Sequence, residues 1–295
     1  PNKNSLKSIY VQTNQDSQID QMKLIHNGET IFDLKKKDAT SWKMVSPIES
    51  DFVNVLNINN LQTNIMQLII DKFGEEHITE DQYAEYGFDD PAYTFYFSQE
   101  DGTETTIYAK DYDTKSAQFV ECLQKETGQI FYCIIQIGSF LLAEPADFLS
   151  DVIYDADMAD VASVQVHIDG ETDLNIELDS ENKQYTVNDI DVAALGTDAV
   201  DALTTLYDNL TGLTTSTLDL TDNVPTEEEP EITLTYNLKD GTTEVITFLA
   251  KDKESYYVLR NGEYSGFLAK RTAFTSRNGI LEFYHRLEKT IGMTE

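Results

Sequence analysis

The chain has 295 residues, of which 40% are apolar and 25% charged, so it is long enough for two ordinary domains and too apolar to be disordered. Its 53 acidic residues outnumber its 21 basic ones, and the net charge of −32 is spread along the sequence. Such a surface repels phosphate backbones and anionic lipid head groups, which argues against nucleic-acid or lipid binding. It would attract cations or a basic partner, or simply keep the protein soluble.

No stretch reaches the roughly twenty apolar residues that a membrane-spanning helix needs. The most apolar run, residues 130–142, contains Gln136, Gly138 and Ser139, and it is predicted to be a strand followed by a turn. The sequence starts with Pro1 and not with Met, so we expect that an N-terminal segment has been removed, and a signal peptide or anchor within it would not be visible in this sequence.

The first elements in chain order are short strands. Apolar and polar residues alternate at 8–12 and at 23–34, and the second of these segments is broken by the turn sequence Asn27-Gly28. Residues 42–46 are predicted to form the next strand, which ends before Pro47.

One long helical pattern follows these strands. Ser50 or Asp51 is positioned to cap the start of the helix, and apolar residues then recur at helical spacing. We expect this apolar stripe to pack against the sheet, because a sheet and a helix must each bury one face. The stripe consists of Phe52, Val55, Leu56, Leu61, Ile65 and Leu68.

Four further strands and a short helix complete the first half of the chain. The turn sequence Asp101-Gly102 joins the first two of these strands into a hairpin. The strands are predicted at 93–98, 105–110, 118–124 and 129–135, and the short helix within 138–149.

The second half repeats this order. Residues 91–103 align without a gap with residues 230–242, and Pro, Thr, Asp, Gly and Thr are identical between them. Each stretch then runs on to an Ala-Lys-Asp sequence, at 109–111 and 250–252. Several matches in the same order and at nearly constant spacing indicate a duplicated module. The strands of the second copy are predicted at 232–237, 244–249, 256–260 and 265–269.

The second copy also repeats the helical stripe. Thr197 or Asp198 is expected to cap this helix, and a short final helix is predicted at 280–289. The stripe consists of Ala199, Leu203, Leu206 and Leu210.

The predicted fold class is therefore α+β, with two tandem copies of a mostly antiparallel sheet module, each packed on one main helix. Residues 1–150 are expected to form the first repeat and residues 151–295 the second, with the boundary in the acidic stretch 149–160. The stretch 221–230, rich in Thr and Glu, is predicted to be a loop inside the second repeat that takes the place of residues 83–91.

Cys122 and Cys133 are the only cysteines. They flank the turn sequence 125–128, and a hairpin centred on its last two residues would place them directly opposite each other on one face. Two hypotheses follow: a disulfide formed in an oxidising compartment, or two small apolar side chains packed in a core. The same face would carry Val120, Phe131 and Ile135.

No residue is predicted to be catalytic, and no cofactor is predicted. The sequence has no Gly-x-Ser-x-Gly motif, no P-loop and no dinucleotide-binding glycine pattern. Its four histidines are not spaced as metal ligands and do not neighbour a cysteine. They are His26, His77, His167 and His285.

The nearest approach to a metal site is the stretch with Asp155, Asp157 and Asp160, and the second is Asp111 with Asp113. Calcium takes six to eight oxygen ligands, which alternating carboxylates can supply. Neither stretch has the glycine and the closing glutamate of an EF-hand loop, so we predict surface acids without a metal and keep calcium as the alternative.

The stretch Tyr86-Gly87-Phe88-Asp89-Asp90-Pro91, followed by a strand and by Asp101-Gly102, resembles the signature of a bacterial family, domain of unknown function 4340. Trp42 before Pro47 and the helix that follows fit the same pattern, so the resemblance covers nearly the whole chain. Phe88 stands where a Leu is commoner, and the second repeat keeps only Pro230 of the motif.

The motif also has a purely structural interpretation. Gly87 permits a turn with positive φ, and Pro91 suits the start of a strand, where its missing N–H is harmless. Tyr86 and Phe88 would then plug the end of a core.

The resemblance implies an extracytoplasmic protein that is anchored to the outer face of the cell membrane by a lipoprotein-like or transmembrane N-terminus. It also implies a protein partner, since some family members are encoded beside subunits of ABC transporters. We therefore expect a non-catalytic binding or scaffold module of the bacterial cell envelope, with an envelope or transporter protein as its partner.

Two alternatives remain open from the residues. One is a binding protein for a small ligand, sugar or peptide that uses the groove between the repeats; the other is a hydrolase with an acidic site. The aromatic residues considered for that groove are Tyr93, Phe95, Tyr256 and Tyr257.

Overall fold

The computed structural model describes residues 8–11, 16–113, 115–134, 138–221 and 224–293. The chain divides into two compact units, Pro1–Ser150 and Asp151–Glu295, at the same point as the boundary predicted from the sequence. None of the described helices is long and apolar enough to span a membrane.

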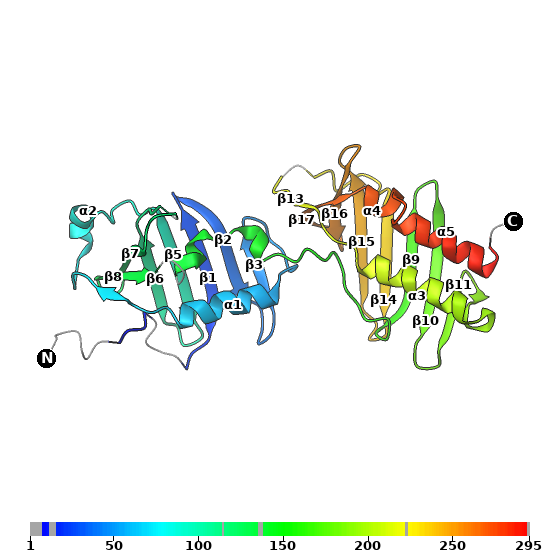
Figure 1. Cartoon of the computed structure of the whole chain (residues 1–295), viewed down its shortest axis with the longest axis horizontal. Helices are drawn as coiled ribbons and strands as arrows, with labels where there is room; N and C mark the ends of the chain where they lie inside the picture. Colours follow the sequence, from blue (N-terminus) through cyan, green and yellow to red (C-terminus); the bar gives the residue numbers. More distant parts are fainter. Residues whose placement is uncertain (1–7, 12–15, 114, 135–137, 222–223, 294–295) are drawn as a thin grey trace. The chain divides into compact units, whose positions relative to one another are not determined.

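The first unit is an antiparallel sheet with one main helix on one of its faces (Figure 1). Its strands are β1 (Ile19–His26), β2 (Glu29–Lys36), β3 (Trp42–Ser46), β4 (Lys72–Phe73), β5 (Tyr93–Gln99), β6 (Glu104–Ala109), β7 (Phe119–Gln124) and β8 (Gln129–Ile134). Its helices are α1 (Val55–Met66), α2 (Tyr83–Tyr86) and the 3-10 helices η2 (Glu80–Gln82), η3 (Gly138–Leu142) and η4 (Pro145–Asp147). The strand order across the sheet is β3-β2-β1-β5-β6-β7-β8-β4.

The second unit has the same plan. Its strands are β9 (Val161–Ile168), β10 (Thr172–Asp179), β11 (Gln184–Val187), β12 (Ile190–Asp191), β13 (Thr217–Leu218), β14 (Ile232–Leu238), β15 (Thr243–Ala250), β16 (Ser255–Arg260) and β17 (Glu263–Lys270). Its helices are η5 (Ala193–Leu195), α3 (Thr197–Thr211), α4 (Thr272–Thr275) and α5 (Ile280–Ile291). The strand order is β12-β11-β10-β9-β14-β15-β16-β17-β13.

The two strand orders are identical apart from the short edge strand β12. In both units the first strand lies in the middle of the sheet, between the second strand and the strand that follows the long connection. In both, the main helix lies between the third strand and the short edge strand in sequence. The predicted α+β fold with two copies of one sheet module is therefore confirmed.

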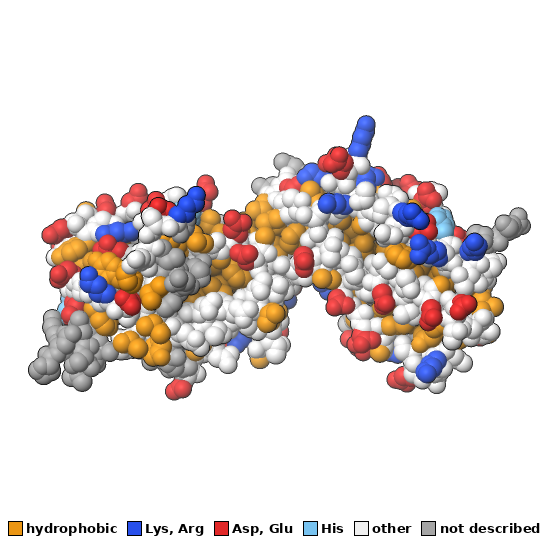
Figure 2. Space-filling model, viewed as in Figure 1, with side chains coloured by type: hydrophobic (Ala, Val, Ile, Leu, Met, Phe, Trp, Pro, Cys, Tyr) orange, Lys and Arg blue, Asp and Glu red, His pale blue; other side chains and the backbone are white. Residues whose placement is uncertain are grey.

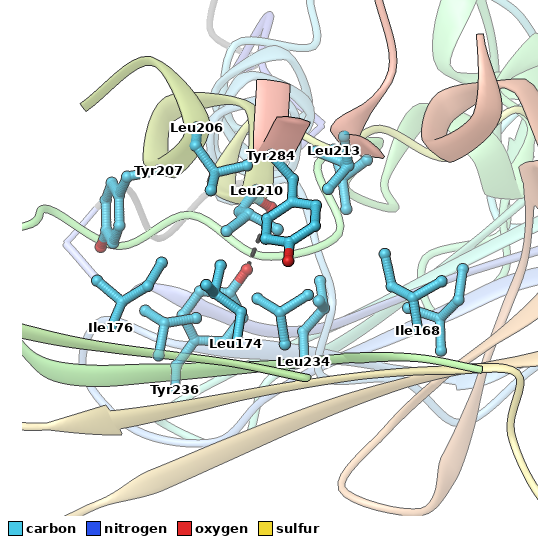
Figure 3. Packing of buried hydrophobic residues seen from close by; sticks show 14 of the residues in the cluster. Ile168, Leu174, Ile176, Leu206, Tyr207, Leu210, Leu213, Leu234, Tyr236 and Tyr284 are labelled. Atoms are coloured by element: carbon cyan, nitrogen blue, oxygen red, sulfur yellow. Dashed lines mark hydrogen bonds between the residues drawn. The ribbon is translucent and has the colours of Figure 1, made fainter. Parts of the chain in front are cut away.

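The core of the second unit lies between the sheet and the helices α3 and α5 (Figure 3). Leu174 and Tyr236 point up from the sheet toward Leu206 and Leu210 of α3, with Tyr284 of α5 beside them. The buried hydroxyl of Tyr236 donates a hydrogen bond of 3.2 Å to the backbone oxygen of Leu210. A buried polar group is stabilising only when it is paired in this way, so this bond helps to fix α3 on the sheet.

An ion pair ties the long connection of the second unit to its last strands. Glu231 accepts two hydrogen bonds from the guanidinium of Arg271, at 2.6 and 3.0 Å, and Arg271 lies over the ring of Tyr256 at 4.2 Å from its centroid. These hydrogen bonds lower the pKa of the Glu231 carboxyl below its ordinary value. Such bidentate pairs are geometrically specific.

The lowered pKa of Glu231 makes the stability of the second unit depend on pH. A carboxyl whose pKa is lower in the folded chain stabilises the fold above its unfolded value, about 4.3, and loses that contribution as the pH falls. We expect Glu231→Gln to lower the urea midpoint at pH 7 and to reduce its fall between about pH 5 and pH 3. Urea titrations at each pH measure this; an unchanged pH profile in the variant would contradict it.

Helix α1 starts later than the sequence predicts. Ser50 pairs with Met44 in an isolated bridge, so the expected cap residues Ser50 and Asp51 precede the helix and do not cap it. The N-cap is Asn54, whose side-chain oxygen accepts the backbone N–H of Asn57 at 3.1 Å. The predicted stripe is therefore wrong at its start.

The remaining members of the stripe divide between helix and loop. Leu61 and Ile65 are buried on the helix, and Leu68 is buried just beyond its end. Leu56 lies on the helix but faces solvent, with 69% of its surface exposed.

Two other predicted helix boundaries are wrong. Helix α3 is preceded by Gly196 at the N-cap position, so Thr197 and Asp198 lie in its first turn, where the Asp198 carboxylate still favours the positive end of the helix dipole. The short helix predicted within 138–149 is replaced by η3 and η4. Only the second unit ends in α-helices.

The predicted strand ends agree with the structure to within two residues, except that β1 starts at Ile19, four residues before the predicted start at residue 23, and that no strand forms at the N-terminus. Residues 8–11 form no strand and contribute one isolated bridge, between Tyr10 and Ile69. Gln12, Ile135 and Gln136, which were also included in predicted elements, lie outside the described residues. The stretch 221–230 lies in the connection between β13 and β14, inside the second unit as predicted.

The two cysteines are buried, free thiols with their sulfur atoms 3.9 Å apart. They are not directly opposite, because the register pairs Cys122 with Phe131 and Val120 with Cys133. The loop between β7 and β8 closes between Gln124 and Gln129, one residue earlier than expected. Diagonal neighbours are typically 7–8 Å apart at Cα, which is too far for an unstrained disulfide.

The thiols should therefore react only after unfolding. The hydrogen bond with Cys133 and burial raise the pKa of Cys122, and a buried thiol is poorly nucleophilic. We expect no reaction of the native chain with Ellman's reagent over minutes, and two reactive thiols per chain in urea without a reductant. If no thiol appears until a reductant is added, the cysteines form a disulfide and the prediction is wrong.

Candidate functional site

The first sheet carries a second, smaller cluster on the face opposite its main core. The connection between β4 and β5 lies over Leu123 and Ile130 there and buries Ile78, Tyr83 and Phe88 against them. Ile78, Tyr83 and Phe88 belong to the covering segment. Leu123 and Ile130 point to the outer face of the sheet, because successive residues of a strand alternate between its two faces. This cluster covers the outer face of the sheet around Leu123 and Ile130.

The motif at residues 86–91 belongs to this cover. Gly87 ends α2 with a φ of 73°, and Phe88 is 1% exposed within the cluster. The structural interpretation of Gly87 and Phe88 is confirmed. Lys110 extends the contact, because its Nζ lies 4.9 Å from the centroid of the Phe88 ring.

A row of polar side chains crosses the outer face beside this cover. Glu121 is the cross-strand partner of Tyr132, and Tyr132 is the partner of Lys72 on β4. Lys110 follows β6 and forms an ion pair with Glu121 at 3.1 Å. The ammonium of Lys72 lies 5.0 Å from the centroid of the Tyr132 ring. The sheet thus aligns two cations, one carboxylate and one phenol side by side.

This row forms the floor of a pocket of about 540 Å³. The loop between β6 and β7 supplies one wall through Asp111, Tyr112 and Ala117, and Phe119 adds an apolar ring that is 42% exposed. Asp71, just before β4, lies on the opposite side. A volume of this size is typical of small-ligand sites.

The two tyrosines of the pocket stay protonated at neutral pH. Burial, followed by the neighbouring Tyr93 and the two cysteines, raises the pKa of Tyr112 to about 12. Burial, followed by the Glu121 carboxylate, raises the pKa of Tyr132. The Tyr112 hydroxyl oxygen is shielded from solvent and has no hydrogen-bond partner in the described part of the chain. The Tyr132 phenol therefore suits hydrogen bonding better than proton abstraction, and the shielded hydroxyl of Tyr112 leaves its ring as its contribution to the pocket.

The second unit lacks this pocket wall. Its hairpin closes from Lys251 to Ser255, whereas the matching hydrogen bond of the first unit joins Lys110 to Glu121, so the loop of the first unit is longer. Lys251, the counterpart of Lys110, pairs with Asp219 in the connection before β14 and lies 5.4 Å from the Tyr257 ring centroid. The two copies share a fold but differ at this site.

None of the four histidines lines the pocket, and each has its own local partner. His26 stacks on Tyr93 with ring centroids 4.3 Å apart, and His77 lies 3.9 Å from the Glu76 carboxylate. His167 pairs with Asp173 on β10, and His285 with Glu288 on α5.

The acidic stretches considered for calcium form local turns. Asp157 accepts the backbone N–H of Ala159 at 2.8 Å, and its backbone oxygen accepts the N–H of Asp160 at 2.9 Å. Asp113 accepts hydrogen bonds from Lys115 and Ser116. Within the residues that the structure describes, no three His, Cys, Asp or Glu side chains are grouped as metal ligands.

The aromatic residues considered for the groove between repeats are mostly core residues. Tyr93, Phe95 and Tyr256 are each buried within one unit, which leaves them unable to line an open groove. Tyr257 is half-buried and packs edge-on against Tyr264, with ring centroids 5.7 Å apart.

The sequence analysis singled out one pocket residue, Asp111, as a possible calcium ligand, and it did not predict the pocket itself. Lys110 was part of the repeated Ala-Lys-Asp sequence, but Lys72, Phe119 and Tyr132 come from separate strands that only the sheet brings together. One signal was present: the spacing between matching strands is longer in the first copy after Lys110.

The chain matches no family model, and no curated protein and no solved structure is similar to it. The resemblance drawn from residues 86–91 therefore stays a prediction.

Proposed function

We propose that this chain is a non-catalytic binding module of the bacterial cell envelope, held at the outer face of the cell membrane, and that the pocket of the first unit is its binding site. The pocket carries the proposal: it has ligand-sized volume, an exposed Phe119 ring and a row of fixed charges. The envelope location is supported by the resemblance of residues 86–91. The chain has a net charge of −32, and acidic side chains are spread over the face that Figure 2 shows.

The structural difference between the two units also supports the pocket as the binding site. Loops that carry function vary while the scaffold that holds them is kept. The first unit adds a longer β6–β7 loop to a strand order that both units share, and this loop forms the pocket wall. In this proposal the second unit, which lacks this pocket wall, does not carry the binding site. An ABC transporter or another envelope protein is the partner that the resemblance favours.

Capture from envelope extracts tests the proposal. The chain is immobilised as wild type, as Phe119→Asp and as Leu142→Asp; Phe119 lines the pocket, and Leu142 is a similarly exposed apolar residue, at 46%, outside it. We expect wild type and Leu142→Asp to retain the same component and Phe119→Asp to lose at least 90% of it. Equal retention by all three, or no retention by wild type, would refute the pocket as binding site.

Labelling of intact cells tests the location. A lysine reagent that does not cross membranes should modify this chain in whole cells of a bacterium that carries it, while a cytoplasmic control protein stays unmodified. Modification only after cell lysis would refute an extracytoplasmic position.

A further inference from the structure

The charges around the first-unit pocket are of both signs. Lys72 and Lys110 lie on its floor, and Asp71 and Asp111 on its rim. Lys110 is already paired with Glu121, whereas Lys72 has no ion pair in the described part of the chain and rests on the Tyr132 ring. Asp71 and Asp111 have no ion pair either in the described part of the chain, although Asp111 accepts the backbone N–H of Tyr112 at 2.9 Å.

A ligand with a single charge fits this arrangement poorly. An anion attracted by Lys72 would meet Asp71 and Asp111 and the field of a chain with net charge −32. A cation attracted by those carboxylates would meet Lys72. A compact ligand with both charges would satisfy both signs, and charge-assisted hydrogen bonds of this kind are the strong ones.

The apolar part of the pocket sets the remaining requirement. Phe119 exposes 42% of its surface there, and Tyr132 and Ala117 add further apolar atoms. Exposed aromatic rings beside a few convergent charges are typical of sites that hold an apolar group and orient it by its polar end.

From these contacts, and resting on the proposed function of this pocket, we propose that the site binds an amino-acid-class ligand. The ligand carries a carboxylate and an ammonium group on one small apolar body, as a free amino acid or a dipeptide does. Lys72 receives the carboxylate, Asp111 on the opposite wall receives the ammonium, and Phe119 and Tyr132 receive the apolar side chain.

Three probes with one phenyl group in common test the charge requirement by calorimetric titration of the full chain. Phenylalanine has both charges, 3-phenylpropanoate lacks the ammonium, and 2-phenylethylamine lacks the carboxylate. We expect phenylalanine to bind at least about tenfold more tightly than either analogue, the loss expected for one charge-assisted hydrogen bond. Glycylphenylalanine and phenylalanylglycine, run beside it, distinguish a dipeptide ligand from a free amino acid.

Matched variants assign the charges to residues. Lys72→Met should weaken the binding of phenylalanine and 3-phenylpropanoate but not that of 2-phenylethylamine, whose repulsion by Lys72 it removes. Asp111→Asn should weaken the binding of phenylalanine and 2-phenylethylamine but not that of 3-phenylpropanoate, whose repulsion by Asp111 it removes. Lys115→Met, an exposed lysine of the same loop outside the pocket, is the control and should change none of them.

The outcomes separate this inference from the proposed function. If either singly charged analogue binds as tightly as phenylalanine, the site recognises one charge and the inference is wrong. If no probe binds while capture remains sensitive to Phe119→Asp, the ligand class is wrong and the binding module stands. Failure of both experiments refutes both proposals.

Discussion

Gly128→Ala is expected to lower the free energy of unfolding of the first unit by about 2–5 kcal/mol. Gly128 has a φ of 64°, a conformation that costs a residue with a Cβ about 1–2 kcal/mol. The added Cβ would also lie 2.4 Å from the backbone oxygen of Ile78 and 2.6 Å from its nitrogen, in the segment that covers the outer face. Overpacking against backbone typically costs a further 1–3 kcal/mol or so.

Gly102 provides the matched control. It also ends a hairpin turn of the first unit at positive φ, 84°, but a Cβ there would meet nothing within 4 Å. Gly102→Ala should therefore lose only the conformational part, about 1–2 kcal/mol. The single tryptophan, Trp42, is buried in β3, so its fluorescence in urea titrations reports on the first unit. Equal losses for the two variants would show that the contact with Ile78 has no energetic weight.

Phe88→Ala is the second large effect, with an expected loss of about 3–5 kcal/mol. Phe88 is 1% exposed and fills the outer cluster together with Ile78, Tyr83 and Leu123. Removal of a buried phenyl ring loses its transfer free energy and leaves a cavity that the surroundings fill only partly. Lys110 would lose the ring over which its ammonium lies.

The control for this variant is Phe119→Ala. Phe119 is 42% exposed in the pocket, so its truncation should change the free energy of unfolding by less than about 1 kcal/mol. Tryptophan fluorescence again measures both variants. A similar loss for Phe119→Ala would mean that the pocket ring supports the fold, and a loss under 1 kcal/mol for Phe88→Ala would mean that the cover is held by other contacts.

Local patterns in the sequence were sufficient for the sheets and for the duplication. Turn sequences such as Asn27-Gly28 and Asp101-Gly102 each contain a glycine at the positive φ that a tight hairpin needs, so the strand ends next to these turns were placed to within two residues, although β1 starts four residues earlier than predicted. The shared spacing of these strands then predicted two modules with one strand order. These features depend on neighbours in sequence, and the sequence records them directly.

Helix starts and hairpin register were harder to predict, because they depend on contacts across the fold. Ser50 is a good cap residue by type, but its backbone pairs with Met44, and Asn54 takes the cap position. The β7–β8 loop places Gly128 as its last residue, with its N–H on the Gln124 oxygen, so the hairpin centre lies earlier than the Thr127-Gly128 pair. Because of this shift, the cross-strand partner of Cys133 is Val120 and not Cys122.

The pocket could not be predicted, since its floor joins four separate segments. Lys72, Lys110, Glu121 and Tyr132 become neighbours only through the pairing of β4 with β8 and of β6 with β7. A two-residue edge strand such as β4 leaves almost no alternation to detect. The unequal loop length between the copies was the visible trace of this site.

Because the first strand of a unit lies in the middle of its sheet, deletions at the two ends of the chain have different effects. Because β1 pairs with β2 on one side and with β5 on the other, deletion of the chain up to His26 would not trim the sheet but cut it into two pieces. Each piece would expose a row of backbone groups ready to recruit another strand, which is a route to aggregation. Loss of α5 at the other terminus would instead uncover one face and leave every strand pair of the second sheet intact. A truncation that keeps the first sheet in one piece must therefore stop before Ile19.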